Sequence, residues 1–172
     1  MYVEGAEDNA VITAIPDQGY DCNGAKPQLK VTKGDVTLKE GTDYEVTYAD
    51  NDKLGTATVT VTGIGNYSGT LTAEFKVVAK DIAECDVQLE KDSYTYTGEA
   101  ITPAVKVAFA KDSDNVLTAD TDYEVAYTDN EKIGTATVTI TGKGNYKGTA
   151  SKTFEIKAIE LKDVAELVVY YR

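Results

Sequence analysis

An internal repeat constrains this chain more than any other feature of its sequence. The segment TDYEVTYADNDKLGTATVTVTGIGNYSGTLTAEFKV, which begins at Thr42, aligns with TDYEVAYTDNEKIGTATVTITGKGNYKGTASKTFEI, which begins at Thr121, at a constant offset of 79 residues. Upstream, YDCNGAKP at residues 20–27 aligns with YTGEAITP at 96–103 at an offset of 76, so the second copy has three extra residues near 111–115. Self-similarity at a fixed period indicates a structural unit used more than once.

The repeat predicts two tandem domains, the first at residues 1–79 with its core at 11–78 and the second at 80–158. Each is about the size at which a small domain folds alone with modest stability. The segment AKDIAE at 79–84 is predicted to be a short linker between them. Because LKDVAE at 161–166 resembles AKDIAE, residues 159–172 are predicted to be the start of a further repeat or a linker.

Alternation of side chains predicts strands within each copy. Apolar residues recur at every second position, with threonines between them in GTATVTVTG, which is typical of a half-buried strand. The predicted inward rows are Ala57, Val59, Val61; Leu71, Ala73, Phe75, Val77; Tyr44, Val46, Tyr48; and, in the second copy, Ala136, Val138, Ile140; Ala150, Phe154, Ile156; Tyr123, Val125, Tyr127. With further strands near 11–15, 28–32 and 36–38, the pattern predicts an all-β fold of two tandem immunoglobulin-like antiparallel β-sandwich domains.

The glycine-rich motif GxGNYxG poses a choice between a phosphate-binding loop and a structural turn. A dinucleotide fingerprint leads from a strand into a helix, whereas here the third glycine comes one residue late and an alternating strand pattern follows. The motif is therefore predicted to close a hairpin, with its tyrosines covering the end of the core and bonding a backbone group. Its residues are Gly63, Gly65, Asn66, Tyr67 and Gly69, and Gly142, Gly144, Asn145, Tyr146 and Gly148.

The motifs GTDYEVTY, GTATVT and GxGNYxG, in this order and twice, resemble the tandem immunoglobulin-like repeats of large bacterial surface proteins, including those called MBG-type. The resemblance covers roughly residues 11–158. It implies stalk or spacer segments of cell-wall-anchored or secreted proteins, chiefly of Gram-positive bacteria, some of which lie beside adhesive or sugar-binding modules. It implies no catalytic residue and no cofactor.

Composition narrows the remaining functions. With 17 Lys and Arg against 29 Asp and Glu, the formal net charge of -12 argues against nucleic acid or an anionic membrane as partner. The sequence contains no histidine and no apolar run long enough to span a bilayer, so a histidine-dependent nucleophile, a conventional zinc site and membrane insertion are not expected. We therefore expect a non-enzymatic monomer without a cofactor or metal.

Three local features keep alternative interpretations open. The acidic turns DNDKLG and DNEKIG, at 50–55 and 129–134, begin like a calcium loop but lack its later ligands, which favours solvated turns. The threonine rows of the GTATVT strands could form a sugar-binding face or an ordinary solvent-facing one. Cys22 and Cys85 could form a disulfide across the junction between the repeats, which would stabilise by about 4 kcal/mol in the chain-entropy model, or stay as two thiols.

These observations predict stalk or spacer repeats of an extracellular bacterial surface or secreted protein, with neighbouring repeats of the same chain as partners. The alternative is an adhesion module that binds a host glycan or protein. The spacer predicts that Tyr44, Tyr67 and their copies are buried, whereas an adhesion module predicts an exposed aromatic patch or concave surface.

Overall fold

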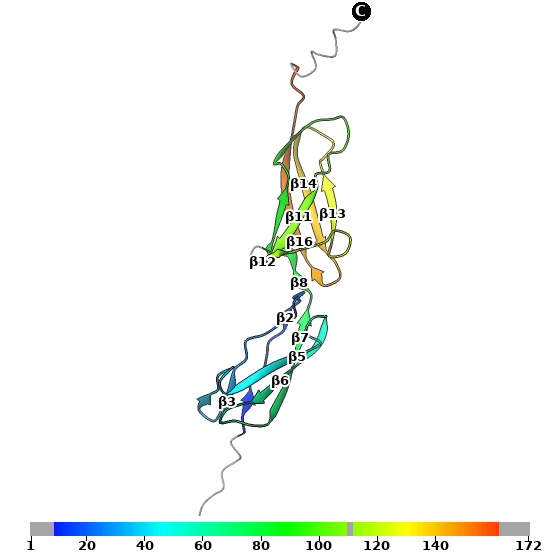
Figure 1. The fold of residues 1–172 in the computed structure, drawn as a ribbon. Coiled ribbons are helices and arrows are strands. Elements are labelled where there is room, and N and C mark those ends of the chain that lie inside the picture. The colour runs from blue at the N-terminus through cyan, green and yellow to red at the C-terminus, as the bar shows by residue number, and fades with distance from the viewer. Residues whose placement is uncertain (1–8, 110–111, 162–172) are drawn as a thin grey trace, which may run out of the picture. The chain divides into compact units, whose positions relative to one another are not determined.

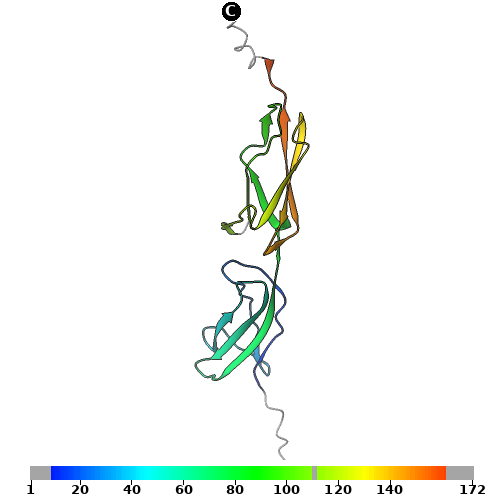
Figure 2. The same cartoon turned by 90° about the vertical axis from the view of Figure 1, so that its right-hand side faces the viewer.

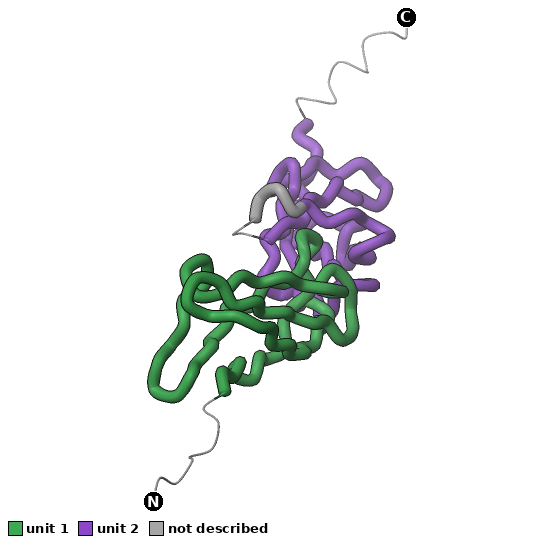
Figure 3. The backbone as a smooth tube through the Cα atoms, turned by 60° about the horizontal axis from the view of Figure 1, so that its bottom comes forward, with its two compact units in different colours: residues 1–80 green, residues 81–172 purple. Residues whose placement is uncertain are grey.

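The computed structural model describes residues 9–109 and 112–161 (Figure 1). The chain divides into two compact units, unit 1 at Met1–Lys80 and unit 2 at Asp81–Arg172, which Figure 3 shows in green and purple. The described residues of both units form strands joined by turns, together with the 3-10 helix η1 (Ile82–Glu84). The prediction of an all-β fold is confirmed.

Unit 1 contains a four-stranded sheet in the order β2-β7-β6-β5 and a three-stranded sheet in the order β1-β3-β4. The two-residue strand β8 (Lys80–Asp81) follows at the boundary between the units. The strands of unit 1 are β1 (Val11–Ile12), β2 (Gln18–Gly19), β3 (Val31–Lys33), β4 (Val36–Thr37), β5 (Tyr44–Ala49), β6 (Gly55–Gly63) and β7 (Thr70–Val78).

Unit 2 has the corresponding pair of sheets, in the orders β10-β16-β14-β13 and β12-β11-β9. Figures 1 and 2 show the long strands β14 and β16 of the four-stranded sheet. The strands of unit 2 are β9 (Cys85–Leu89), β10 (Ser93–Thr95), β11 (Val105–Phe109), β12 (Asp112–Val116), β13 (Tyr123–Thr128), β14 (Gly134–Gly142), β15 (Tyr146–Lys147) and β16 (Thr149–Lys157).

The two units share one strand register in their larger sheets. Tyr44 pairs with Gly63 in unit 1, and Tyr123 pairs with Gly142 in unit 2. The neighbouring hairpins also agree, because Ala57 lies opposite Phe75 and Ala136 lies opposite Phe154. The sequence offset of 79 residues therefore corresponds to equivalent places in the two sheets.

The core of unit 1 receives side chains from both of its sheets. Val31 of β3 and Leu38 are buried in one cluster with Tyr44 of β5 and Val61 of β6. A second cluster contains Ala57, Val59, Phe75 and Val77, so the inward rows of β6 and β7 lie where alternation predicts them. Burying a side chain of this size contributes roughly 1.5–3 kcal/mol, and the threonines between the valines face away from this core.

The expectation of purely antiparallel sheets is wrong at one edge of each unit. Strand β2 pairs in parallel with β7, and β10 pairs in parallel with β16. The sequence predicts that unit 1 begins with one strand at 11–15. The structure instead has two short strands, β1 in the smaller sheet and β2 in the larger one. Pro16 lies between them, and because proline has no N–H to donate to a ladder, it suits the place where the chain changes sheets.

The prediction that AKDIAE is a linker is also wrong, because part of it is built into unit 2. Ile82 in η1 is fully buried, and η1 packs against β16. Asp81 caps η1, since its carboxylate accepts a hydrogen bond of 2.9 Å from the N–H of Ala83. The predicted further repeat or linker at 159–172 lies outside the described residues beyond Leu161.

An asparagine clamp, not apparent from the sequence, holds the acidic turn of each unit. The Asn51 side-chain amide donates to the carbonyl of Ala25 at 3.0 Å, while the N–H of Ala25 donates to the carbonyl of Asn51 at 2.8 Å. The same pair of bonds joins Asn130 to Ile101, at 3.0 and 2.9 Å. The asparagine thus ties each turn to the segment that leads toward the smaller sheet.

Replacing Ile82 by alanine tests whether the 79–84 segment belongs to unit 2. Because the side chain is fully buried, we expect Ile82→Ala to lower the free energy of unfolding by about 2–5 kcal/mol. The matched control is Ile133→Ala in the same unit, which removes a side chain that is 60% exposed and is expected to change stability by less than about 0.5 kcal/mol. Equal effects in urea unfolding followed by circular dichroism would show that the segment is a linker after all.

Candidate functional site

The GxGNYxG motif connects β6 to β7 in unit 1 and β14 to β16 in unit 2. The N–H of Gly63 donates to the carbonyl of Gly69 at 2.9 Å, and Gly142 and Gly148 make the same bond at 2.9 Å. Strand β7 rather than a helix follows the loop, so no helix terminus faces it. The structure places the motif in a hairpin and gives a nucleotide phosphate no helix N-terminus to bind.

Glycine is required at the first position of the motif because the loop folds tightly back on the strand. A Cβ atom at Gly63 would lie 2.7 Å from the backbone nitrogen of Ser68, and one at Gly142 would lie 2.7 Å from that of Lys147. Gly65 has a φ of 62°, a left-handed conformation that glycine adopts without steric cost. The order of glycines therefore follows from backbone geometry.

An aspartate in the turn directly before the neighbouring strand fixes the position of each loop. The side-chain carboxylate of Asp43 accepts a hydrogen bond from the N–H of Lys39 at 2.8 Å. The backbone carbonyl of Asp43 accepts one from the N–H of Ile64 at 2.9 Å. In unit 2, Asp122 accepts from the N–H groups of Thr118 at 2.8 Å and Lys143 at 2.9 Å. This aspartate, the D of the TDY motif, acts as a structural anchor.

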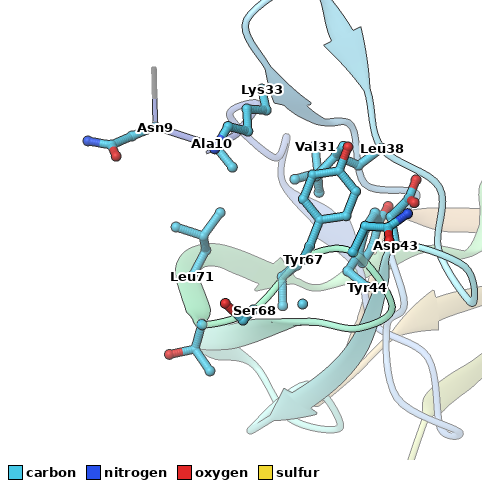
Figure 4. A pocket seen from close by; sticks show the side chains of 15 residues that line it. Asn9, Ala10, Val31, Lys33, Leu38, Asp43, Tyr44, Tyr67, Ser68 and Leu71 are labelled. Carbon is cyan, nitrogen blue, oxygen red and sulfur yellow. The ribbon is translucent and has the colours of Figure 1, made fainter. Parts of the chain in front are cut away.

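A pocket of about 500 Å³ opens beside the loop of unit 1. Figure 4 shows the Tyr67 ring at its centre, with Leu71 and Ala10 on one side of the view and Asp43 and Tyr44 on the other. Its other apolar lining comes from Val31, Leu38 and Val61, and its other polar lining includes Asn9, Lys33, Asn66 and Ser68. The lining therefore combines polar and apolar groups in about equal measure, and a concavity of this size can hold a small ligand.

In unit 2 the corresponding tyrosine is covered. This residue, Tyr146, is only 5% exposed and stacks on Phe109, with the ring centroids 6.0 Å apart and the planes 29° apart. At the offset of 76, the residue of unit 1 that corresponds to Phe109 is Lys33, which is exposed and lines the pocket. Tyr67 is consequently half-buried, whereas Tyr44, Tyr123 and Tyr146 are buried.

Tyrosine hydroxyls bond backbone carbonyls, but not at the predicted motif position in unit 1. Tyr48 donates to the carbonyl of Pro27 at 3.1 Å, and Tyr127 donates to that of Pro103 at 2.5 Å. Within the described part of the chain, the Tyr67 hydroxyl makes no such bond. The predicted bond is wrong for Tyr67, because the half-open loop leaves its ring beside a pocket.

Burial and nearby carboxylates alter the titration of the inward tyrosines. Burial raises the pKa of Tyr44 above its ordinary value of 10.0, and the negative charges of Glu40 and Asp43 raise it further. Burial likewise raises the pKa of Tyr123, with a smaller contribution from Asp120 and Asp122. Both phenols are therefore held in the protonated, neutral form, which suits structural side chains.

The other candidate sites lie apart from this pocket. Cys22 is exposed and lines a shallow cavity of about 610 Å³, and the half-buried Cys85 begins β9. Both are thiols in the structure and belong to different units, so the disulfide stays a prediction. In the turn at 50–55, Asp50 is paired with Lys53 at 2.6 Å, and no three His, Cys, Asp or Glu residues cluster as metal ligands within residues 9–109 and 112–161.

Lys33 is the residue of the pocket that sequence reasoning missed. A signal was present, because the alignment at an offset of 76 pairs Lys33 with Phe109, a polar with an aromatic residue.

The threonines of β6 are half-buried at Thr58 and Thr60 and exposed at Thr56 and Thr62. They lie on the face of the sheet opposite the buried valines, and a glycan-binding role for them stays a prediction.

Comparison with known proteins identifies a family. A family model described as a lipoprotein associated domain matches residues 11–98, just over half of the chain. The match covers the described strands of unit 1 and extends through β9 and β10 of unit 2. No curated protein matches the chain. Among the described residues, no helix has the length and apolar character needed to cross a membrane.

The two loop tyrosines should differ in their contribution to stability. We expect Tyr146→Ala to lower the free energy of unfolding by about 3–5 kcal/mol, because it removes a buried ring stacked on Phe109. Tyr67→Ala should cost only about 1–2 kcal/mol, because that ring is half-buried beside the pocket. Urea unfolding of the two variants measures the difference. Equal losses of unfolding free energy would contradict the description of Tyr146 as buried and of Tyr67 as half-buried beside a pocket.

The buried tyrosines should also make stability depend on alkaline pH. Because the folded-state pKa of Tyr44 lies above 10.0, its contribution is fully present below about pH 10 and is lost as the pH rises through the folded-state pKa. We expect the urea midpoint of the wild type to fall above pH 10, and to fall less steeply in Tyr44→Phe/Tyr123→Phe. The two proteins differ only in these two hydroxyl groups, so identical slopes would contradict the role assigned to these tyrosines.

Proposed function

The chain belongs to the family of lipoprotein associated domains, and from this premise we propose that its two units are non-enzymatic spacer domains of a bacterial surface protein. Membership of this family indicates a location at the bacterial cell envelope or surface. We further propose that the units are tandem immunoglobulin-like domains of the MBG type, exposed on the outer side of the envelope and acting as monomers.

One observation carries the spacer proposal: the two units have the same arrangement of strands, and most of the repeated tyrosines pack in the interior. Tyr44, Tyr123 and Tyr146 are 3–5% exposed, and Tyr48 and Tyr127 bond the carbonyls of equivalent prolines. Residues that are repeated because they hold a fold together suit a module whose task is to provide length. The formal net charge of -12 favours mutual repulsion and solubility of such modules and disfavours nucleic acid as a partner.

The alternative, an adhesion module for a host glycan or protein, has a specific observation in its favour. The pocket of unit 1 combines the half-buried Tyr67 ring with polar side chains such as Asn66 and Lys33. An aromatic ring flanked by hydrogen-bonding groups can bind a sugar. The spacer is preferred because only one of the two repeated loops offers this surface, whereas the buried framework is common to both.

Surface display tests the spacer. An epitope is fused to the carboxyl end of the chain, with zero, one or two copies of the chain between it and a lipid-anchored amino terminus on a bacterial cell. We expect binding of an antibody coupled to a large bead to increase with the number of copies, while binding of a small antibody fragment stays constant.

The display experiment has a matched control in Tyr67→Ala, which alters the pocket and leaves the number of units unchanged. Accessibility that does not depend on copy number would contradict the spacer. Saturable micromolar binding of the wild-type chain to a glycan array, lost in Tyr67→Ala, would favour the adhesion module instead.

A further inference from the structure

The pocket beside Tyr67 corresponds to a place that is filled in unit 2. There the aromatic ring of Phe109 covers Tyr146, and the 79–84 segment, here called the lead-in segment, packs over the same end of the sheet. Ile82 of this segment is fully buried against β16, whose first residues correspond to Thr70 and Leu71 of the pocket. Unit 2 therefore shows which chemistry fits this site.

The third glycine of each loop gives an independent indication. A Cβ atom at Gly148 would collide with the carboxylate of Asp81, so the lead-in segment lies directly over this glycine. At the corresponding Gly69, a Cβ atom would meet nothing within 4 Å in the described part of unit 1. The backbone of the loop is thus covered by an aspartate in unit 2, whereas no residue of the described part of unit 1 covers it.

Charge distinguishes the open site from the filled one. Lys33 lies at the pocket of unit 1 where unit 2 has Phe109, and within residues 9–109 and 112–161 it makes no ion pair. In a chain with a net charge of -12, a lysine beside the apolar side chains of this pocket favours a ligand that has both an apolar and an acidic group. The lead-in segment has this combination, with Asp81 directly before Ile82 and Glu84 after it.

We propose that the pocket of unit 1 is a socket for a peptide segment of the lead-in type, in which an aliphatic side chain directly follows an aspartate. The aliphatic side chain occupies the space beside Tyr67 and Leu71, and Lys33 attracts the acidic groups. The sequence has this pattern a second time, as KDVAE at 162–166. The inference rests on the proposed function, because a neighbouring repeat is what supplies such a segment.

A peptide titration tests the socket with the full 172-residue chain. The probe is an acetylated peptide with the sequence of residues 78–84, VAKDIAE, and the readout is the amide spectrum of the isotopically labelled protein. We expect saturable shifts at Gly69, Thr70 and Leu71. A peptide in which Ile82→Ser replaces the aliphatic side chain should bind at least about tenfold more weakly.

Two protein variants locate the binding. Lys33→Glu reverses the charge that is proposed to attract the acidic groups, so it should weaken binding of the peptide, and an unchanged unfolding midpoint shows that the variant is folded. Lys26→Glu makes the same change at the Cys22 cavity and should bind the peptide as the wild type does. If Lys33→Glu were unfolded, Lys33→Gln would serve, and it should also weaken binding of the acidic peptide.

Three results would overturn the proposal: no saturable shift, equal binding of the Ile82→Ser peptide, or unchanged binding by the folded Lys33 variant. Binding only to a protein that begins at Asn9 would also overturn it, since the occupant would then be the chain's own first eight residues. None of these results affects the bead-accessibility measurement, so failure of the socket is distinguishable from failure of the spacer.

Discussion

The rest of each unit depends on one central strand with a strictly alternating apolar row. Strand β6 has β5 on one side and β7 on the other, and its residues Ala57 and Val59 are fully buried between the two sheets. A slip of one residue would turn this row to solvent and bury threonines instead. The register set by β6 and repeated in β14 places the glycine loop, the tyrosines and the aspartate anchor.

Much of this arrangement is predictable from the sequence, because alternation and repetition are local signals. The rows on β5, β6 and β7 and the hairpin at Gly63 follow from side-chain period and glycine order. What alternation could not reveal are pairings of two or three residues, such as the parallel contact of Gln18 with Val77. The position of such a short edge strand depends on where the chain passes from one sheet to the other, and tertiary packing determines that place.

The sequence pattern did not predict the role of the lead-in segment or the presence of the pocket, for a different physical reason. A short run of mixed polar and apolar residues is typical of a linker, and only packing against β16 shows that Ile82 belongs to the core of unit 2. At the pocket, Lys33 stands where unit 2 has Phe109. The positions at which the two copies agree form the strands and the interior, whereas the pocket includes a position at which they differ.

This difference lies outside the framework that the two units share. The interior framework uses Asp43, Tyr44 and the first glycine of the loop, and unit 2 uses Asp122, Tyr123 and Gly142 in the same way. The pocket adds Lys33 at the end of the short strand β3, where a change of side chain leaves the buried row intact. The lining of this end of a repeat can therefore differ between copies while the buried framework stays the same.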